Sequence, residues 1–221
     1  IEARPLPASG EAGFVPEPEA AARLIDRSVR AIALVTPNNP TGTLIPPADL
    51  DRFFSCVPED TIVLCDEAYR EYADDPEAAS AFRWVHRKNV LITRTFAKIY
   101  GLASLRIGYG IARPEIIAKM EKCRLPFNTS APAQAAAQAA LDDEGHVRAS
   151  RENNQREKER LSAACSRLGI RCYPTQGNFL LWEIRSDASG LVTNLEGEGV
   201  IVRPLGAFGL PDGGGFLVRG G

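Results

Sequence analysis

The sequence predicts an α/β fold, with a mainly parallel sheet that has helices on both faces, followed by a smaller α+β domain. Short apolar segments alternate with helical segments through the first part of the 221-residue chain, which is the rhythm of βαβ units. After one long charged helix, short strands surround a single helix, as in an α+β domain. We place the boundary near Gly145, so that residues 1–144 form the large domain and residues 145–221 form the small one.

The elements of the predicted large domain follow one another closely. Residues 1–19 are rich in Pro, Ala and Glu, and we expect an irregular segment that leads into a helix. The run Ala31–Thr36 is almost wholly apolar, as expected of a strand covered on both faces. Further strands are predicted at Thr61–Asp66, Val90–Thr93 and Arg106–Ala112, and helices at Pro47–Cys56, Pro114–Lys122 and Ala131–Leu141.

The predicted small domain begins with the long helix. Gly145 is expected to interrupt the helical pattern, after which Val147–Leu168 forms one helix that ends at Gly169. This helix is dense in Arg, Glu and Lys, so we interpret it as a solvated face. Short strands are predicted at Ile170–Tyr173, Asn178–Ile184, Val200–Val202 and Phe216–Arg219. The abrupt start and the strand at the very end predict a chain that is cut at both ends.

Composition excludes several classes of function. The chain is 44% hydrophobic and 24% charged with a formal net charge of -2, which argues against a nucleic-acid or anionic-membrane partner. No apolar run reaches the roughly 20 residues of a membrane span, and no leader peptide is visible. The 5 cysteines show no framework spacing, which favours a reducing compartment, the cytoplasm. His86 and His146 lie far from any cysteine cluster, so we expect surface histidines and no metal site.

Four polar features follow or precede predicted strands at the edge where ligands bind in open α/β sheets. They are Thr36–Gly42, Asp66–Tyr69, Thr95–Lys98 and Ser104–Arg106. Each alone has an ordinary explanation, since Asn-Pro and Thr-Gly form turns, an acid after a strand caps helices, and a loop lysine is usually solvated. All four together, in this order, are far more specific.

The segment Thr93–Tyr109 resembles the surroundings of the Schiff-base lysine in class I and II aminotransferases, which are fold-type I enzymes dependent on pyridoxal 5′-phosphate (PLP). Asn38–Gly42 and Asp66–Tyr69 match two preceding motifs of the family, and the resemblance runs from about Ala31 to the end. It implies that a glycine-rich turn, a ring-stacking aromatic and a tyrosine reaching the partner's cofactor precede Ile1. It also implies a last strand and helix after Gly221.

The resemblance implies roles for the residues that hold the cofactor. Lys98 would be the catalytic residue, attached to the cofactor aldehyde and later moving a proton. Asp66 would pair with the pyridinium nitrogen. Asn39 and Tyr69 would hydrogen-bond the phenolic oxygen, although both types also serve as turn or core residues.

The remaining implied contacts concern phosphate and substrate. Arg106 would bind the cofactor phosphate with its guanidinium fork, and Thr95 would add a hydroxyl. Arg219 resembles the arginine that grips the substrate carboxylate. Arg203 resembles a phosphate-binding position of histidinol-phosphate aminotransferases, with a surface arginine as the plain alternative. Asn178 matches a motif residue near the site.

Finer features favour the histidinol-phosphate branch of the family. Leu125–Ser130, Gln176–Leu180 and Val200–Leu205 are all similar to that branch. The resemblance then implies amino transfer between L-histidinol phosphate and 2-oxoglutarate in histidine biosynthesis, by a homodimer acting on small molecules. Alternatives are an aminotransferase for aromatic or other amino acids, a PLP-dependent decarboxylase of an amino acid phosphate, and a non-enzymatic sensor domain of a transcription regulator.

Overall fold

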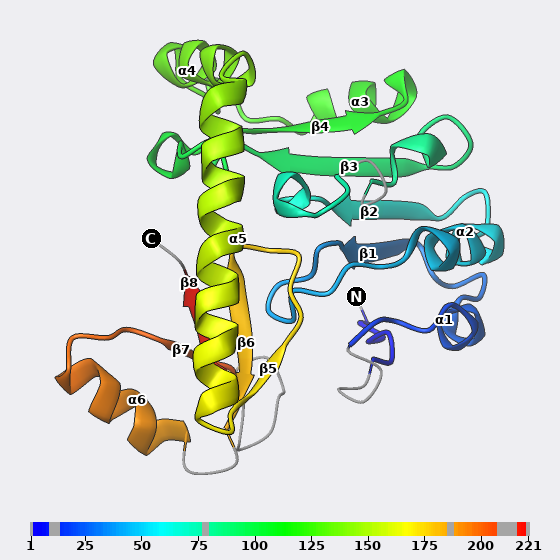
Figure 1. Cartoon of the computed structure of the whole chain (residues 1–221). Helices are drawn as coiled ribbons and strands as arrows, with labels where there is room; N and C mark the ends of the chain where they lie inside the picture. Colours follow the sequence, from blue (N-terminus) through cyan, green and yellow to red (C-terminus); the bar gives the residue numbers. More distant parts are fainter. Residues whose placement is uncertain (1, 9–13, 77–79, 185–187, 207–215, 220–221) are drawn as a thin grey trace.

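The chain forms two four-stranded sheets joined along one long helix (Figure 1). The computed structural model describes residues 2–8, 14–76, 80–184 and 190–206, and the backbone of residues 188–189 and 216–219. The first sheet has the strand order β1-β2-β3-β4 and the second the order β5-β6-β8-β7. The predicted mixture of a large α/β part and smaller C-terminal strands is therefore present, while the boundary between residues 144 and 145 stays a prediction.

The first sheet is mainly parallel, as predicted. Its strands are β1 (Ala31–Val35), β2 (Ile62–Asp66), β3 (Val90–Thr95) and β4 (Gly108–Ala112). The first three are parallel to one another, and β4 pairs with β3 in the antiparallel sense. Val35 lies opposite Asp66, and Asp66 lies opposite Thr93, so the three parallel strands end at one edge. In Figure 1 this edge faces α5.

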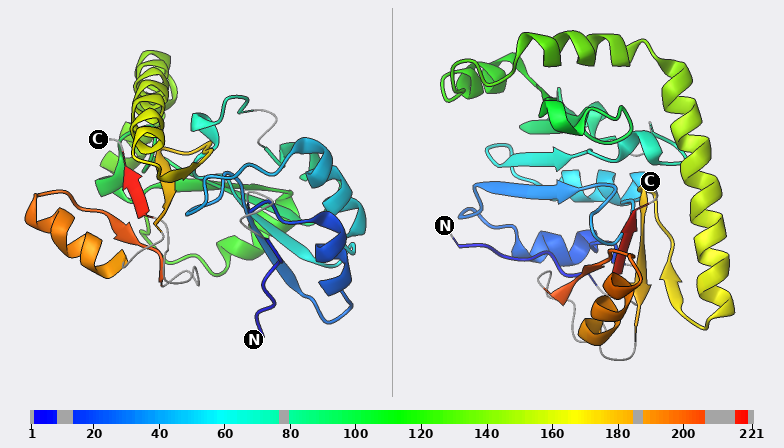
Figure 2. Two further views of the ribbon diagram at one scale, coloured as in Figure 1. Left: turned by 60° about the horizontal axis from the view of Figure 1, so that its bottom comes forward. Right: turned by 90° about the vertical axis from the view of Figure 1, so that its left-hand side faces the viewer.

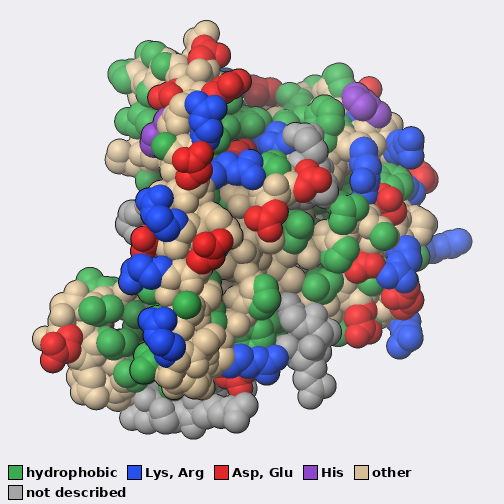
Figure 3. Space-filling model, in the orientation of Figure 1, with side chains coloured by type: hydrophobic (Ala, Val, Ile, Leu, Met, Phe, Trp, Pro, Cys, Tyr) green, Lys and Arg blue, Asp and Glu red, His purple; other side chains and the backbone are tan. Residues whose placement is uncertain are grey.

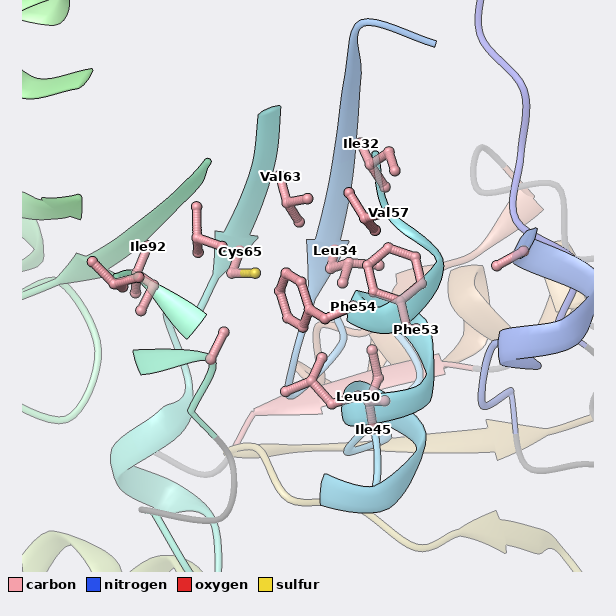
Figure 4. Packing of buried hydrophobic residues seen from close by; sticks show 14 residues of the cluster. Ile32, Leu34, Ile45, Leu50, Phe53, Phe54, Val57, Val63, Cys65 and Ile92 are labelled. Carbon is pink, nitrogen blue, oxygen red and sulfur yellow. The ribbon is translucent and has the colours of Figure 1, made fainter. Parts of the chain in front are cut away.

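A helix covers one face of this sheet. Leu50, Phe53 and Phe54 of α2 (Pro47–Cys56) are buried against the sheet, and the ring of Phe54 stacks on Trp84 at 5.0 Å. Full burial of each such side chain stabilises the fold by about 1.5–3 kcal/mol. The strand residues of this core alternate along β1, β2 and β3 (Figure 4): Ile32, Leu34, Val63, Cys65, Val90 and Ile92. Helix α1 (Pro18–Leu24) packs beside α2.

The face of β1 and β2 that points away from α2 is exposed, which differs from the prediction. Ala31 and Ala33 are exposed, and Ile62 is 44% exposed. The apolar run in β1 predicted a strand covered on both faces, but the described residues cover only one. The apolar run was misleading because its larger residues, Ile32 and Leu34, point to α2, while only small alanines occupy the alternate positions on the exposed face.

The later part of the first sheet leads into three helices. α3 (Pro114–Glu121) follows β4, and α4 (Ala131–Leu141) packs through Ala133 and Ala137 against Phe96. Short 3₁₀ turns connect the strands: η1 (Arg70–Tyr72), η2 (Phe82–Trp84) and η3 (Ala103–Leu105). Ser130 begins α4 as its N-cap, where its hydroxyl accepts a hydrogen bond from the Ala133 N–H at 3.2 Å.

Helix α5 (Glu144–Arg167) runs from α4 past the ends of the parallel strands to the second sheet (Figures 1 and 2). The break between α4 and α5 falls at Asp142–Asp143, so Gly145 lies inside the helix and does not interrupt it. The helix ends at Arg167, with Leu168 as its C-cap, and Gly169 follows with a φ of 68°, as predicted for a C-terminal stop. Only Cys165 of this helix is buried, and acidic and basic side chains alternate along its visible face (Figure 3).

The second sheet is antiparallel. It consists of β5 (Arg171–Tyr173), β6 (Phe179–Glu183), β8 (Phe216–Arg219) and β7 (Arg203–Pro204), with α6 (Ala188–Gly197) beside them. The strand expected at Val200–Val202 is wrong, because pairing begins only at Arg203. Ile201 is 85% exposed there, whereas Val202 packs with Ile184. None of the described helices combines the length and apolar character needed to cross a membrane.

Candidate functional site

Three residues predicted to act together meet at the carboxyl ends of the parallel strands. The Tyr69 side chain is only 3% exposed, and its hydroxyl accepts a hydrogen bond from Asn39 Nδ2 at 2.9 Å. Lys98 Nζ lies 5.2 Å from the centre of the Tyr69 ring. These contacts join the loops after β1, β2 and β3, which are separated in sequence by about 30 residues each. The structure therefore brings Asn39, Tyr69 and Lys98 into one cluster.

The loop after β1 is held by its own polar groups. The Asn38 N–H donates to the Thr43 carbonyl at 2.8 Å, and the Gly42 N–H donates to the Asn38 carbonyl at 2.7 Å. Gly42 has a φ of 75°, a conformation that glycine adopts without strain. Asn38 Nδ2 also donates to Thr41 Oγ1 at 2.7 Å. This tight turn fixes Asn39 so that its amide points to Tyr69.

Asp66 ends β2 on the side of the sheet away from α2. Its neighbours Cys65 and Glu67 are both buried completely, so strand alternation directs Asp66 to the opposite face. The Ala68 N–H donates to Asp66 Oδ1 at 3.0 Å, which fixes the carboxylate at the start of the following turn. This contact corresponds to the capping role that the sequence left open, and it orients the acid without burying it fully.

Thr95 and Arg106 lie on adjacent segments but bond within their own loops. Thr95 Oγ1 accepts from the Ala97 N–H at 3.0 Å, and Arg106 Nη1 donates to the Ala103 carbonyl at 3.0 Å. The Phe96 N–H donates to the Ile107 carbonyl, which ties the lysine loop to the loop that carries Arg106. Arg106 is exposed and has a φ of 51°. A guanidinium and a hydroxyl therefore flank the Lys98 loop.

The second sheet reaches the cluster through Phe179. Its ring packs edge-on against Tyr69 with centroids 5.0 Å apart. Asn178, the residue before it, has a buried Oδ1 without a hydrogen-bond partner among the described residues. Such an acceptor is costly unless a ligand donates to it.

The two candidate arginines lie on the neighbouring strands. Arg219 lies opposite Phe179 in the sheet register, and its side chain is outside the described part of the chain. Arg203 lies opposite Leu217 on the edge strand β7 and is exposed. The structure thus brings the Arg219 backbone toward the cluster and leaves Arg203 on the surface.

Sequence reasoning singled out Asn178 but missed the contacts that hold its loop in place. Three hydrogen bonds hold the backbone of this loop. The Gln176 N–H donates to the Gly42 carbonyl at 2.7 Å. Asn154 Nδ2 donates to the Gly177 carbonyl and Lys158 Nζ donates to the Thr175 carbonyl, both at 3.2 Å. Burial lowers the pKa of Lys158, an effect that Asp74 partly offsets. No signal in the sequence links these positions, because they are far apart along the chain.

A second missed feature lies behind the cluster. Glu67 is completely buried and forms an ion pair of 2.9 Å with Arg94. The sequence singled out Asp66 in the Asp-Glu pair and assigned no role in the site to Glu67. A buried carboxylate beside a strand arginine leaves no periodic pattern that would identify it.

The histidines are both exposed, as predicted, but His146 is not without contacts. Its Nε2 lies 2.9 Å from the carbonyl oxygen of Ile99, the residue after Lys98. Helix α5 therefore touches the lysine loop through its first turn. Across the described ranges, no group of three or more His, Cys, Asp or Glu side chains could hold a metal ion.

The set of side chains suits an aldehyde-bearing, phosphorylated pyridine. An amine can bond an aldehyde, a carboxylate can pair with a ring nitrogen, and the Asn39–Tyr69 pair can hydrogen-bond an oxygen on the ring. A cavity of about 1100 Å³ is lined by β1, by the N-terminal segment and by the loop after β1, including Asn39. Lys98 and Asp66 lie beyond its lining, so we locate the site by the side-chain cluster and not by the cavity.

Comparison with known proteins gives one consistent family. The sequence profile of Aminotransferase class I and II matches residues 1–217. Histidinol-phosphate aminotransferase 1 of Cupriavidus pinatubonensis is 44% identical over 197 residues, which cover 87% of this chain and 52% of that protein. The chain thus spans about half the length of the curated relatives it matches.

Solved structures support the same assignment of the fold. Histidinol-phosphate aminotransferase from Sinorhizobium meliloti, in complex with pyridoxal-5′-phosphate, superimposes with a TM-score of 0.83 and 28% identity. The match covers 93% of this chain and 57% of that one. Aspartate aminotransferase from Thermus thermophilus with maleate has a TM-score of 0.84 and 28% identity, over 96% of this chain and 58% of that one.

Proposed function

The chain belongs to the class I and II aminotransferases, and from this premise we propose that the whole protein is a PLP-dependent enzyme. Its reaction would transfer an amino group between L-histidinol phosphate and 2-oxoglutarate, in histidine biosynthesis. The observation that carries the proposal is the Lys98 amine over the ring of Tyr69, whose hydroxyl is held by Asn39. The family is PLP-dependent, and the relative at 44% identity is named for histidinol phosphate.

Four residues would hold the ring and aldehyde of the cofactor. PLP, when bound, supplies an aldehyde for the amino group and a ring that takes up electrons from the substrate Cα. Lys98 would bond the aldehyde carbon, and its released amine would move the proton at the substrate Cα. Asp66 would keep the pyridine nitrogen protonated. The Asn39 amide and the Tyr69 hydroxyl would hydrogen-bond the phenolic oxygen.

The remaining residues would bind phosphate and substrate. Thr95 and Arg106 would hold the cofactor phosphate, where a guanidinium fork matches the oxygens. Arg219 would bind the carboxylate of 2-oxoglutarate, and Arg203 the phosphate of the donor. Asn178 would offer its buried Oδ1 to a donor group on the substrate. We further propose a homodimer in the cytoplasm, with residues 1–144 as the cofactor domain and residues 145–221 as the small domain.

The test is amino transfer by the full-length protein. Histidinol phosphate, phenylalanine and aspartate are each supplied with 2-oxoglutarate, and glutamate, keto product and carbon dioxide are measured. We expect glutamate to form fastest with histidinol phosphate, and Lys98→Ala to lower the rate by roughly 10²–10⁴-fold. A preference for phenylalanine or aspartate would contradict the substrate assignment. Release of carbon dioxide from phenylalanine or aspartate in place of a keto product would instead indicate a decarboxylase, since histidinol phosphate has no carboxyl group to lose.

A further inference from the structure

Directly behind the cofactor residues lies a buried ion pair with no part in the proposed chemistry. Glu67 is fully buried, and its Oε2 accepts from Arg94 Nε at 3.0 Å and from Arg94 Nη2 at 2.9 Å. Its Oε1 accepts from the Ala81 N–H at 2.7 Å and from Ser80 Oγ at 3.0 Å. Arg94 Nη2 also donates to Ser80 Oγ at 3.1 Å. The carboxylate is therefore hydrogen-bonded at both oxygens.

The ion pair lies where it can fix the positions of the strand ends that carry the site residues. Glu67 immediately follows Asp66, and Arg94 immediately precedes Thr95 in β3. Because side chains alternate along a strand, the pair lies on the face covered by α2, while Asp66 and Thr95 point to the other face. The Glu67 N–H also donates to the Thr93 carbonyl at 2.9 Å. The ion pair thus joins the ends of β2 and β3 behind the cluster.

An ion pair in this place is a constraint on geometry more than a source of stability. Buried charges lose their hydration, so a well-packed apolar pair would often be as stable. A guanidinium that bonds a carboxylate through two nitrogens fixes direction and distance in a way that apolar contact does not. Burial by itself would lower the pKa of Arg94, but the Glu67 carboxylate and the Tyr109 hydroxyl together raise it, so Arg94 stays charged.

We propose that Glu67 and Arg94 are positioning residues that fix the separation of Asp66 from the Lys98 loop. Asp66 and Lys98 would contact opposite parts of one rigid ring, the nitrogen and the aldehyde-bearing side. Both contacts can be made together only if the ends of β2 and β3 keep a set spacing. This inference rests on the proposed cofactor, and it assigns a role to two residues that touch neither cofactor nor substrate.

The experiment measures PLP binding to the full-length apoprotein. Glu67→Gln keeps the shape of the side chain and removes its charge, and Arg94→Lys keeps the charge and removes the fork. Glu59→Gln is the matched control, because Glu59 pairs with Lys88 at 2.6 Å near the opposite ends of the same strands. The readouts are the dissociation constant of PLP, the pH midpoint of its visible absorption band, and the melting temperature of the apoprotein.

We expect Glu67→Gln to weaken PLP binding at least tenfold and to shift the pH midpoint of the band. Arg94→Lys should weaken binding at least threefold, and Glu59→Gln should leave both readouts at their wild-type values. If Glu67→Gln does not fold, Ser80→Ala takes its place, since it removes one hydrogen bond from the same carboxylate, and a threefold loss is expected. A lower melting temperature with unchanged PLP affinity and midpoint would reduce the pair to a structural role and overturn the inference.

The same measurements separate this inference from the proposed function. Wild-type protein that forms no visible band with PLP, or a band that survives Lys98→Ala, would refute the proposed function and this inference with it. A normal wild-type band that Lys98→Ala abolishes, together with unaltered binding by Glu67→Gln and Arg94→Lys, would refute only the inference.

Discussion

At Gly42 the requirement for glycine has two separate physical causes. The residue has a φ of 75°, and a Cβ built on it would lie 2.1 Å from Thr175 Oγ1 and 2.5 Å from Thr175 Cβ. The first cause is local strain, and the second is a collision between the loop after β1 and the loop before β6. The backbone of the loop that holds Asn39 is therefore shaped by a residue of the loop that connects β5 and β6.

Gly42→Ala should destabilise the protein by about 2–4 kcal/mol, from about 1 kcal/mol of backbone strain and about 1–3 kcal/mol of overpacking. Gly169→Ala is the control, because Gly169 has a φ of 68° and nothing lies within 4 Å of the place that its Cβ would take. It should cost only the strain. Urea unfolding measures both, and Thr175→Gly should recover part of the loss in Gly42→Ala. Equal effects of the two alanine variants would contradict the collision.

The ionisation of Glu71 should make the stability of the folded protein depend on pH. Burial raises the pKa of this carboxyl above its ordinary value of 4.5, although its backbone hydrogen bond, Arg70 and Arg94 act in the other direction. The folded state therefore holds the proton more tightly than the unfolded state does. Stability should fall as pH rises from about 4.5 through the folded pKa of Glu71, because the folded chain must then lose a proton that it favours.

Glu71→Gln removes this dependence. The free energy of unfolding of the variant, relative to wild type, should increase as pH rises from about 4.5 through the folded pKa of Glu71, as measured by urea titration at several pH values. Glu198→Gln, at an exposed acid, controls for the loss of one charge. A difference that is constant across this range would show that burial of Glu71 does not govern its ionisation.

At the residue scale, the sequence was most informative where chemistry required a particular side chain. Asn39, Tyr69 and Lys98 were each identified from motifs, and the structure brings them together. The contacts of Glu67 and Gly42 were not foreseen, because they depend on residues 27 and more than 100 positions away. A motif predicts the chemical role of a residue, whereas these contacts depend on how distant segments of the chain fold against it.

At the scale of elements, helices with clear start and stop signals were predicted closely. Pro47–Cys56 and Ala131–Leu141 match α2 and α4 at both ends, because proline in the first turn fixes each start. Val200–Val202 failed as a strand because β-branched residues suit any extended segment, and only pairing with β8 decides which residues form a ladder. Gly145 failed as a break because an acidic N-cap precedes it and starts the helix there.

That cap, Asp143, permits a prediction for α5. Its side chain accepts from the His146 N–H at 2.9 Å, and the same His146 contacts the Ile99 carbonyl of the lysine loop. Asp143→Ala should lower stability by about 1 kcal/mol, the usual cost of losing an N-cap. Asp142→Ala, which removes the same charge one residue earlier, should change it by less than about 0.5 kcal/mol. Thermal unfolding of the two variants tests the cap, and equal losses would argue against it.

For the whole molecule, the question is whether the two sheets unfold as one unit. The loop before β6 bonds the first sheet's loops through Gln176, whose side chain accepts from the Asp74 N–H at 2.8 Å and donates to Asp74 Oδ2 at 2.9 Å. Arg151 of α5 adds a bond to the Ala73 carbonyl at 3.0 Å. These bonds between the two sheets are polar and join residues that are 102 and 78 positions apart, so no local pattern could predict them.

Because polar bonds form these contacts between the two sheets, the loss of a single side chain should measurably weaken the coupling of the sheets. Gln176→Ala removes two bonds to Asp74 and leaves the cores of both sheets intact. We expect amide hydrogen exchange in β6 to become faster by about tenfold, the equivalent of about 1.4 kcal/mol, while exchange in β2 changes little. Gln155→Ala is the matched control, since the Gln155 side chain bonds Glu159 within the exposed face of α5. If β2 and β6 accelerate equally, the two sheets open as one cooperative unit, and the division into two domains would not describe how this chain unfolds.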